Sequence, residues 1–209
     1  MIKFKYENAG LSIKQLEELN KYLNEKIIDI ANFFNTNKDL TIIIKIFKSK
    51  KELDNFIITN DLFKPEPYIV GFLNPDINKI FCCNYNDYDN TLHKGETFLE
   101  YKKMILHECV HILHTHYMPD NYEYFNNCLW EGIACYLTNQ YQECSLENVN
   151  MKDLLSNNLS YRVYYTIVKK IVEKYGTKKV QRLLKFTEDS NEILDQIIKE
   201  EGRKDENVR

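Results

Sequence analysis

The sequence has no long apolar stretch and no excess of one charge. Nowhere do eighteen apolar residues follow one another, and residues 1–6 lack the apolar core of a secretion signal. The chain carries 28 lysines and arginines against 31 acidic residues, and its net charge of -3 is spread along the whole length. These absences argue against a membrane span, a polybasic membrane patch and a nucleic-acid footprint. We therefore expect a soluble, cytoplasmic protein that binds neither membranes nor nucleic acid.

The absence of a secretion signal also bears on the six cysteines, which we expect to stay reduced. Cys82 and Cys83 are adjacent in a predicted strand, so their side chains should point to opposite faces and not share a metal ion. Cys109 and Cys135 fall within predicted helices and are expected to be small buried apolar groups.

A chain of 209 residues with 44% hydrophobic and 13% aromatic residues can bury a core of its own. We expect a single α+β domain over 1–209. Its expected parts are an N-terminal helix and central strand over 1–66, an edge hairpin and metal-binding helices over 67–140, a helical part over 141–201, and a frayed tail over 202–209.

The N-terminal half alternates helical and strand patterns. Ser12 and Gln15 form a capping-box pattern ahead of apolar residues spaced three and four apart, which predicts a helix over 12–34. The β-branched run over 40–47 predicts a central strand, and Ser49 should cap a helix that ends near residue 59. The runs 68–73 and 79–84 predict a hairpin, and 87–96 a solvated loop. From about residue 153 the pattern is helical again, with helices expected over 159–175, 178–186 and 192–200.

Histidine is scarce, and its placement is the most informative feature of the chain. Among only five histidines, His107 and His111 flank Glu108 in the pattern HExxH. Thr97 and Glu100 form a second capping-box pattern ahead of them, so the segment should be helical. Positions four apart on a helix differ by about 40°, and both imidazoles can then bind one ion. The alternative is a pair of buried histidines held by ordinary hydrogen bonds.

Glu131, at the head of a second predicted helix, can supply a third ligand and leave one coordination position open for water. Glu108 would then lie beside the ion as a general base and acid. His114 falls on the same helix face as His111 and is expected to flank the site rather than to bind the ion. Gly132 is expected to allow close packing of the two metal-binding helices.

An HExxH helix followed by a helix with Glu-Gly-x-Ala resembles the gluzincins, the thermolysin-like metallopeptidases. The metzincin pattern does not fit, because it needs Gly and His where this chain has His114 and Tyr117. The resemblance implies a zincin-like fold with one zinc ion per chain. It also implies an edge strand, at 69–73 or 80–83, that binds the substrate backbone. Tyr161 is similar to the tyrosine that stabilises the oxyanion in gluzincin aminopeptidases, and Tyr164 and Tyr165 are alternatives.

The chain departs from the resemblance at Cys135, where thermolysin-type enzymes have an aspartate that orients the first histidine. Loss of that carboxylate would weaken metal binding. Arg162 could contact substrate, although a solvated arginine is the simpler interpretation. We expect a zinc peptidase that cleaves peptide or protein substrates. A catalytically silent binding module and a zinc hydrolase of non-peptide amides or esters are the alternatives. The sequence leaves open the side-chain preference, the choice between endopeptidase and aminopeptidase, and the oligomeric state.

Overall fold

The computed structural model describes residues 1–36, 39–118, 126–156, 159–185 and 189–204, without the side chains of 202–204. The chain divides into two compact units, Met1–Thr115 and His116–Arg209, and each is described by itself. The expectation of a single domain therefore stays a prediction. Among the described residues, no helix combines the length and the apolar character that a membrane span needs.

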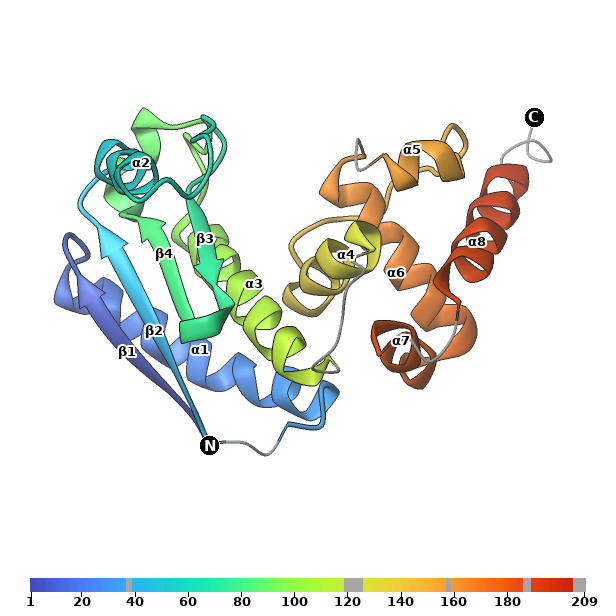
Figure 1. Ribbon diagram of the computed structural model, residues 1–209, viewed down its shortest axis with the longest axis horizontal. Helices are drawn as coiled ribbons and strands as arrows, with labels where there is room; N and C mark the ends of the chain where they lie inside the picture. The colour runs from blue at the N-terminus through green and yellow to red at the C-terminus, as the bar shows by residue number, and fades with distance from the viewer. Residues whose placement is uncertain (37–38, 119–125, 157–158, 186–188, 205–209) are drawn as a thin grey trace. The chain divides into compact units, whose positions relative to one another are not determined.

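The first unit is built on a mixed four-stranded sheet with the order β1-β2-β4-β3 (Figure 1). β2 pairs in parallel with both β1 and β4, and β3 pairs antiparallel with β4. The strands are β1 (Ile2–Asn8), β2 (Leu40–Phe47), β3 (Gly71–Asn74) and β4 (Lys79–Cys83). The central strand predicted over 40–47 is thus confirmed, with the same bounds.

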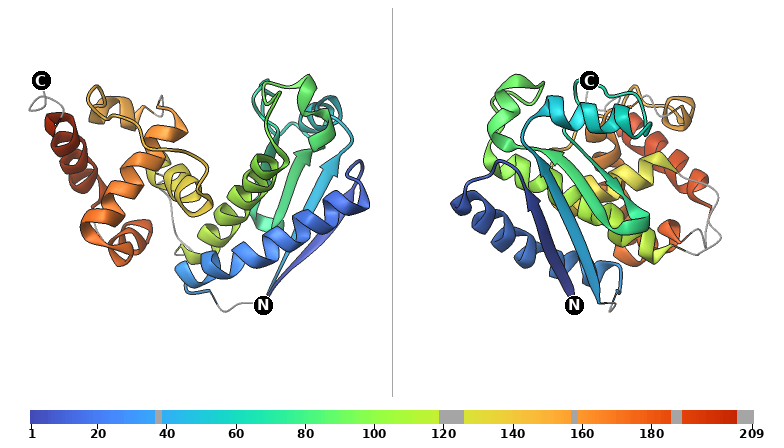
Figure 2. Two further views of the ribbon diagram at one scale, coloured as in Figure 1. Left: turned by 180° about the vertical axis from the view of Figure 1, so that it is seen from behind. Right: turned by 60° about the vertical axis from the view of Figure 1, so that its left-hand side comes forward.

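Helices cover both faces of this sheet. Figure 2 shows α1 (Ile13–Phe33) and α3 (Phe98–Tyr117) on one face, and α2 (Lys50–Thr59) on the opposite face. Alternate residues of β2 divide between the two faces because a strand has a period of two. Ile42, Ile44 and Ile46 are completely buried on one face. On the other, Phe47 packs against Phe56 of α2 with ring centroids 5.1 Å apart.

The predicted helix starts are confirmed by hydrogen bonds. Ser12 Oγ accepts from the backbone N–H of Gln15, and Gln15 Oε1 accepts from the backbone N–H of Ser12 at 2.9 Å. Ser49 Oγ accepts from the N–H of Glu52 in the same way. Each bond satisfies a backbone donor that the first helical turn leaves without a partner.

The sequence analysis missed β1. Its half-buried residues Ile2, Phe4 and Tyr6 alternate with exposed residues at positions 3, 5 and 7. This period-two pattern is the signal that could have revealed the strand.

The predicted hairpin is confirmed, with a shorter first strand than expected. β3 begins at Gly71 rather than at Tyr68, and its connection to β4 contains a 3-10 turn over Pro75–Ile77. Asn78 closes the turn in a left-handed conformation with φ of 50°. β3 is an edge strand of the sheet and β4 is internal. The expectation that 80–83 could be an edge strand is therefore wrong. A 3-10 helix, η2 (Tyr85–Asn90), also begins the segment expected to be a loop.

The second unit is helical throughout its described secondary structure, as the sequence predicts for this half. It contains α4 (Asn127–Thr138), α5 (Met151–Leu155), α6 (Tyr161–Tyr175), α7 (Thr177–Leu184) and α8 (Ser190–Lys204). Gly176 ends α6 with φ of 78°, as expected of a glycine after a helix. α8 continues past Gly202, where a frayed tail was predicted. Phe186 and residues 205–209 lie outside the described residues.

Arg162 is not simply solvated. Its Nε and Nη2 donate to the backbone carbonyls of Gln142 and Glu143 at 3.0 and 2.8 Å. Thr166, one turn further along α6, accepts from the backbone N–H of Cys144 at 3.1 Å. The segment after α4 is therefore attached along α6.

Candidate metal centre

α3 carries the HExxH motif in a well-anchored helix. Its start is a complete capping box, in which Thr97 Oγ1 accepts from the N–H of Glu100 at 3.4 Å and Glu100 Oε2 accepts from the N–H of Thr97 at 2.5 Å. Further along, the Tyr101 hydroxyl donates to the carbonyl of Cys83 in β4 at 3.2 Å. These contacts fix the position of the helix on the sheet and thereby that of the two histidines.

His107 and His111 face one another from successive turns of α3. Both are buried, with 5% and 3% of their surfaces exposed. Their Nε2 atoms lie 2.9 Å apart, and their rings are nearly perpendicular at 83°. Two ligands of a tetrahedral zinc ion, each about 2.05 Å from it, would lie roughly 3.3 Å apart. The observed spacing also suits a hydrogen bond in which one Nε2 donates to the other.

Glu131 supplies a third possible ligand. It lies in the second turn of α4, which Asn126 caps by accepting from the N–H of Leu129 at 3.2 Å. The ligand atoms of His107, His111 and Glu131 all lie within 4.8 Å of one another. Two imidazoles and a carboxylate form a donor set that zinc uses in hydrolytic enzymes. The group could therefore hold a metal ion, as the sequence predicts, and zinc fits its donors.

The other predicted site residues differ in accessibility. Glu108 is half-buried, directly after His107. In the first turn of α6, Tyr161 is 43% exposed, whereas Tyr164 and Tyr165 are buried. The Tyr165 hydroxyl donates to Asn139 Oδ1 at 3.5 Å, and burial raises the pKa of Tyr164. The role of Tyr161 stays a prediction.

His114 is not part of the candidate metal group, as expected. It is buried, and its ring stacks on Phe34 at the end of α1, with ring centroids 5.5 Å apart. The ring therefore helps to pack α3 against α1.

Gly132 lies against α6, and the expected packing of the two metal-binding helices stays a prediction. A Cβ atom at this position would lie 2.6 Å from Val168 Cγ2 and 2.7 Å from the carbonyl oxygen of Tyr164. Both of those residues belong to α6. Gly132 thus allows close packing of α4 on α6. The Glu-Gly pair could not reveal this, because the sequence does not say which helix packs on the glycine.

The cysteines are all free thiols, as predicted. Five are completely buried, and Cys144 is half-buried. Burial raises the pKa of the Cys82 thiol to about 12 and that of Cys109 well above its ordinary value. Cys135, at the position of the thermolysin-type aspartate, is among the buried thiols.

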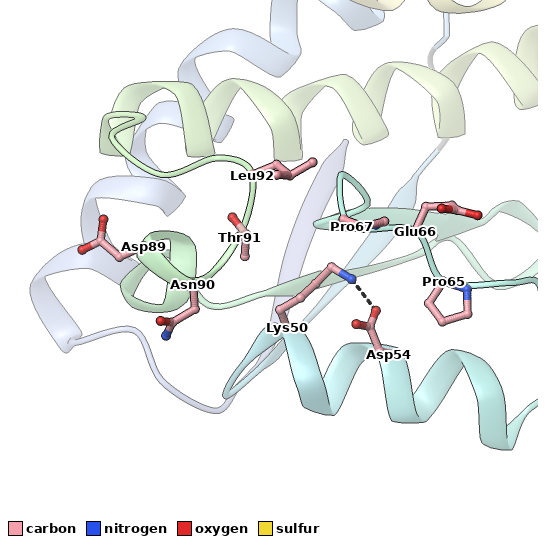
Figure 3. Close-up of a pocket in the computed structure, with 9 residues that line it drawn as sticks. All are labelled: Lys50, Asp54, Pro65, Glu66, Pro67, Asp89, Asn90, Thr91 and Leu92. Carbon is pink, nitrogen blue, oxygen red and sulfur yellow. Dashed lines mark hydrogen bonds and ion pairs between the residues drawn. The ribbon is translucent and has the colours of Figure 1, made fainter.

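A cavity of about 550 Å³ lies elsewhere in the first unit (Figure 3). Its walls come from α2, from the segment before β3, and from the end of η2 with the two residues after it. The lining residues are Lys50, Asp54, Pro65, Glu66, Pro67, Asp89, Asn90, Thr91 and Leu92. None of the candidate metal ligands lines it. Sequence analysis missed this cavity, since its three walls are separated along the chain and share no motif.

Comparison with known proteins adds no assignment. No family model matches the chain, and no curated protein matches it significantly.

Proposed function

We propose that this protein is a zinc-dependent peptidase whose ion is bound by His107, His111 and Glu131. The observation that supports the proposal is the convergence of their ligand atoms within 4.8 Å. Zinc enzymes commonly use three such protein ligands and leave a fourth position open. When bound, zinc would lower the pKa of a water molecule to about 7 and polarise the scissile carbonyl.

Glu108 performs the proton transfers in this proposal. It follows the first histidine on α3, so its carboxylate can lie beside the ion without binding it. A carboxylate oxygen of Glu108 accepts the proton of the attacking water and then delivers it to the nitrogen of the leaving amine. General acid–base steps of this kind contribute about 10²- to 10⁴-fold to the rate.

Tyr161 holds the oxyanion in this proposal, by analogy with the gluzincin aminopeptidases. Its phenol hydroxyl would donate to the oxygen of the former carbonyl as negative charge develops there. Among the three tyrosines, its exposed side chain makes its hydroxyl the most accessible to substrate. A donor placed in this way can stabilise the transition state by about 3 kcal/mol.

The test combines metal analysis with peptide-library cleavage by the full chain, with and without a chelator. We expect about one zinc per chain and cleavage that the chelator abolishes. Glu108→Gln should retain the zinc and lose turnover by about 10²-fold or more. Glu192→Gln, an exposed residue in the first turn of α8, is the matched control and should behave as wild type.

Two results would contradict the proposal in different ways. Full turnover in Glu108→Gln would dismiss Glu108 as the base. A wild-type chain that binds zinc but cleaves no peptide would leave the metal site intact and dismiss the peptidase activity.

A further inference from the structure

His93 joins two segments of the first unit that are far apart in the sequence. It follows η2 and precedes α3, and its side chain is 26% exposed. Its Nδ1 lies 2.8 Å from Glu96 Oε1, and its Nε2 lies 2.9 Å from the backbone oxygen of Tyr68. The ring packs against Tyr88 of η2, with centroids 5.4 Å apart. Both ring nitrogens therefore have a partner.

The chemistry of these two partners determines the protonation of the ring. A carboxylate and a backbone carbonyl can accept hydrogen bonds but cannot donate them. A neutral imidazole has one N–H, so it can serve only one of the two, whereas an imidazolium has two. We propose that His93 is a proton-operated clamp, whose imidazolium holds the Tyr68 segment against the segment that leads into α3.

The clamp has no substitute in the surrounding structure. Its bond to Tyr68 is the only hydrogen bond between residues 61–70 and residues 85–97, all of which the structure describes. The same two segments form facing walls of the cavity in Figure 3, through Pro65–Pro67 on one side and Asp89–Leu92 on the other. Two residues after Tyr68, the carbonyl of Val70 accepts from the N–H of Cys83 at 2.9 Å. The clamp therefore fixes one wall of the cavity and the approach to edge strand β3.

The number of ring protons on His93 determines how the clamp responds to pH. The clamp needs both ring protons, so its contribution is present while the ring is an imidazolium and is lost as pH rises and the ring becomes neutral. His93 is the one histidine in residues 50–70 and 85–97, and the other ionisable side chains that face this region are carboxyl, phenol and ammonium groups. These groups are Lys50, Asp54, Asp61, Lys64, Glu66, Tyr68, Tyr85, Asp87, Tyr88, Asp89, Lys94 and Glu96. Burial raises the pKa of Tyr88 further, so its phenol stays neutral.

Amide hydrogen exchange in the full chain tests the clamp. The reporters are the N–H groups of Ile69 and Cys83, which donate to Glu66 and Val70 within and beside the clamped segment. Protection factors correct for the intrinsic pH dependence of exchange. The single N–H of the neutral ring stays with the charged carboxylate of Glu96, which is the stronger acceptor, so the bond to Tyr68 is the one lost. We therefore expect protection to be about fivefold higher at pH 5.5 than at pH 8.

Two variants should respond in opposite directions. His93→Gln removes the titrating group, so protection should be low and the same at both pH values. In Glu96→Gln, the new amide can donate to Nδ1 of the neutral ring while Nε2–H donates to Tyr68, so protection should stay high at pH 8. Lys94 is an exposed residue next to His93, and Lys94→Gln is the control for a change of charge. Its protection factors should fall from pH 5.5 to pH 8 as in the wild type.

Equal protection at both pH values in the wild type would overturn the proposal. A fall in protection at pH 8 in Glu96→Gln as large as in the wild type would also overturn it. If His93→Gln does not fold, the Glu96→Gln result decides the question alone. No metal ion or substrate takes part in this test, so its outcome is independent of the proposed peptidase activity.

Discussion

At the scale of single residues, the HExxH motif does not by itself determine how the imidazoles of His107 and His111 are arranged. Nitrogen atoms 2.9 Å apart cannot both carry a proton toward each other, so a shared proton or a cation must lie between them. The ligand atoms of both rings and of Glu131 lie within 4.8 Å of one another, so the group could hold a metal ion. The spacing of the motif allows this arrangement, and the side-chain conformations determine it.

Thiol reactivity is a second prediction at the residue scale. A thiolate is the reactive form, and burial raises the pKa of Cys82, Cys83, Cys109 and Cys128. We expect a disulfide-exchange reagent at pH 8 to label only the half-buried Cys144 rapidly in the native chain. Six thiols should react in denaturant. Fewer than six would indicate a disulfide and contradict the reduced state.

Substitution of two glycines tests close packing. Gly132→Ala should destabilise the protein by about 1–2 kcal/mol, because the backbone carbonyl of Tyr164 blocks the added methyl and outweighs the gain in helix propensity. At Gly71 the obstacle is Met104 Sδ at 2.7 Å, in a flexible side chain that can move. Gly71→Ala should therefore cost less. Urea unfolding measures the free energy of unfolding of both variants. If both lost the same amount, the rigid backbone of α6 would not be the cause of the larger loss expected for Gly132→Ala.

At the scale of the element, helix starts differ in how well they are capped, although their sequences look alike. Thr97 and Ser160 both precede helices, yet Thr97 takes part in a full capping box and Ser160 makes no side-chain capping bond. Thr97→Ala should lower the free energy of unfolding by about 1 kcal/mol, and Ser160→Ala should change it by much less. Urea unfolding of the metal-free chain separates the two. Equal effects would show that the Thr97 bond contributes nothing.

The Thr97 capping box also predicts a pH dependence. Hydrogen bonds from Thr97 Oγ1 and its backbone N–H lower the pKa of the Glu100 carboxyl. Their contribution is present above the ordinary glutamate value, near pH 4.3, and is lost as pH falls through the lower value of the folded state. The stability difference between wild type and Thr97→Ala should therefore shrink below about pH 4. A difference that stays constant down to pH 3 would contradict this cause.

At the scale of the whole molecule, zinc binding and stability should be linked. A ligand that binds only the folded chain stabilises it, by about 2.7 kcal/mol at a concentration of 100 times Kd. We expect zinc to raise the Tm, a chelator to reverse the rise, and Glu131→Gln to abolish most of it. The rise should diminish as pH falls, because the imidazoles must be deprotonated to bind zinc. Thermal unfolding with and without zinc measures the effect, and an unchanged rise in Glu131→Gln would remove Glu131 from the ligand set.

Much of the N-terminal fold could be predicted because its signals are local. Ser12 and Thr97 sit next to the helices that they cap, and the β-branched run over 40–47 forms a strand wherever it is buried. The alternating pattern of β1 is also local, but its pairing partner lies 38 residues away at Leu40. Local patterns suggest that a segment is a strand, but they do not identify the segment beside it.

The sequence by itself determined the donor types of the candidate metal centre, because helix periodicity alone places His107 and His111 on one face. Only the tertiary structure decided that Glu131 lies near them, that Gly132 packs on α6, and that His93 binds Tyr68. Each of these contacts joins residues that are distant in sequence. Contacts of that kind depend on how whole elements pack, which no local pattern of residues specifies.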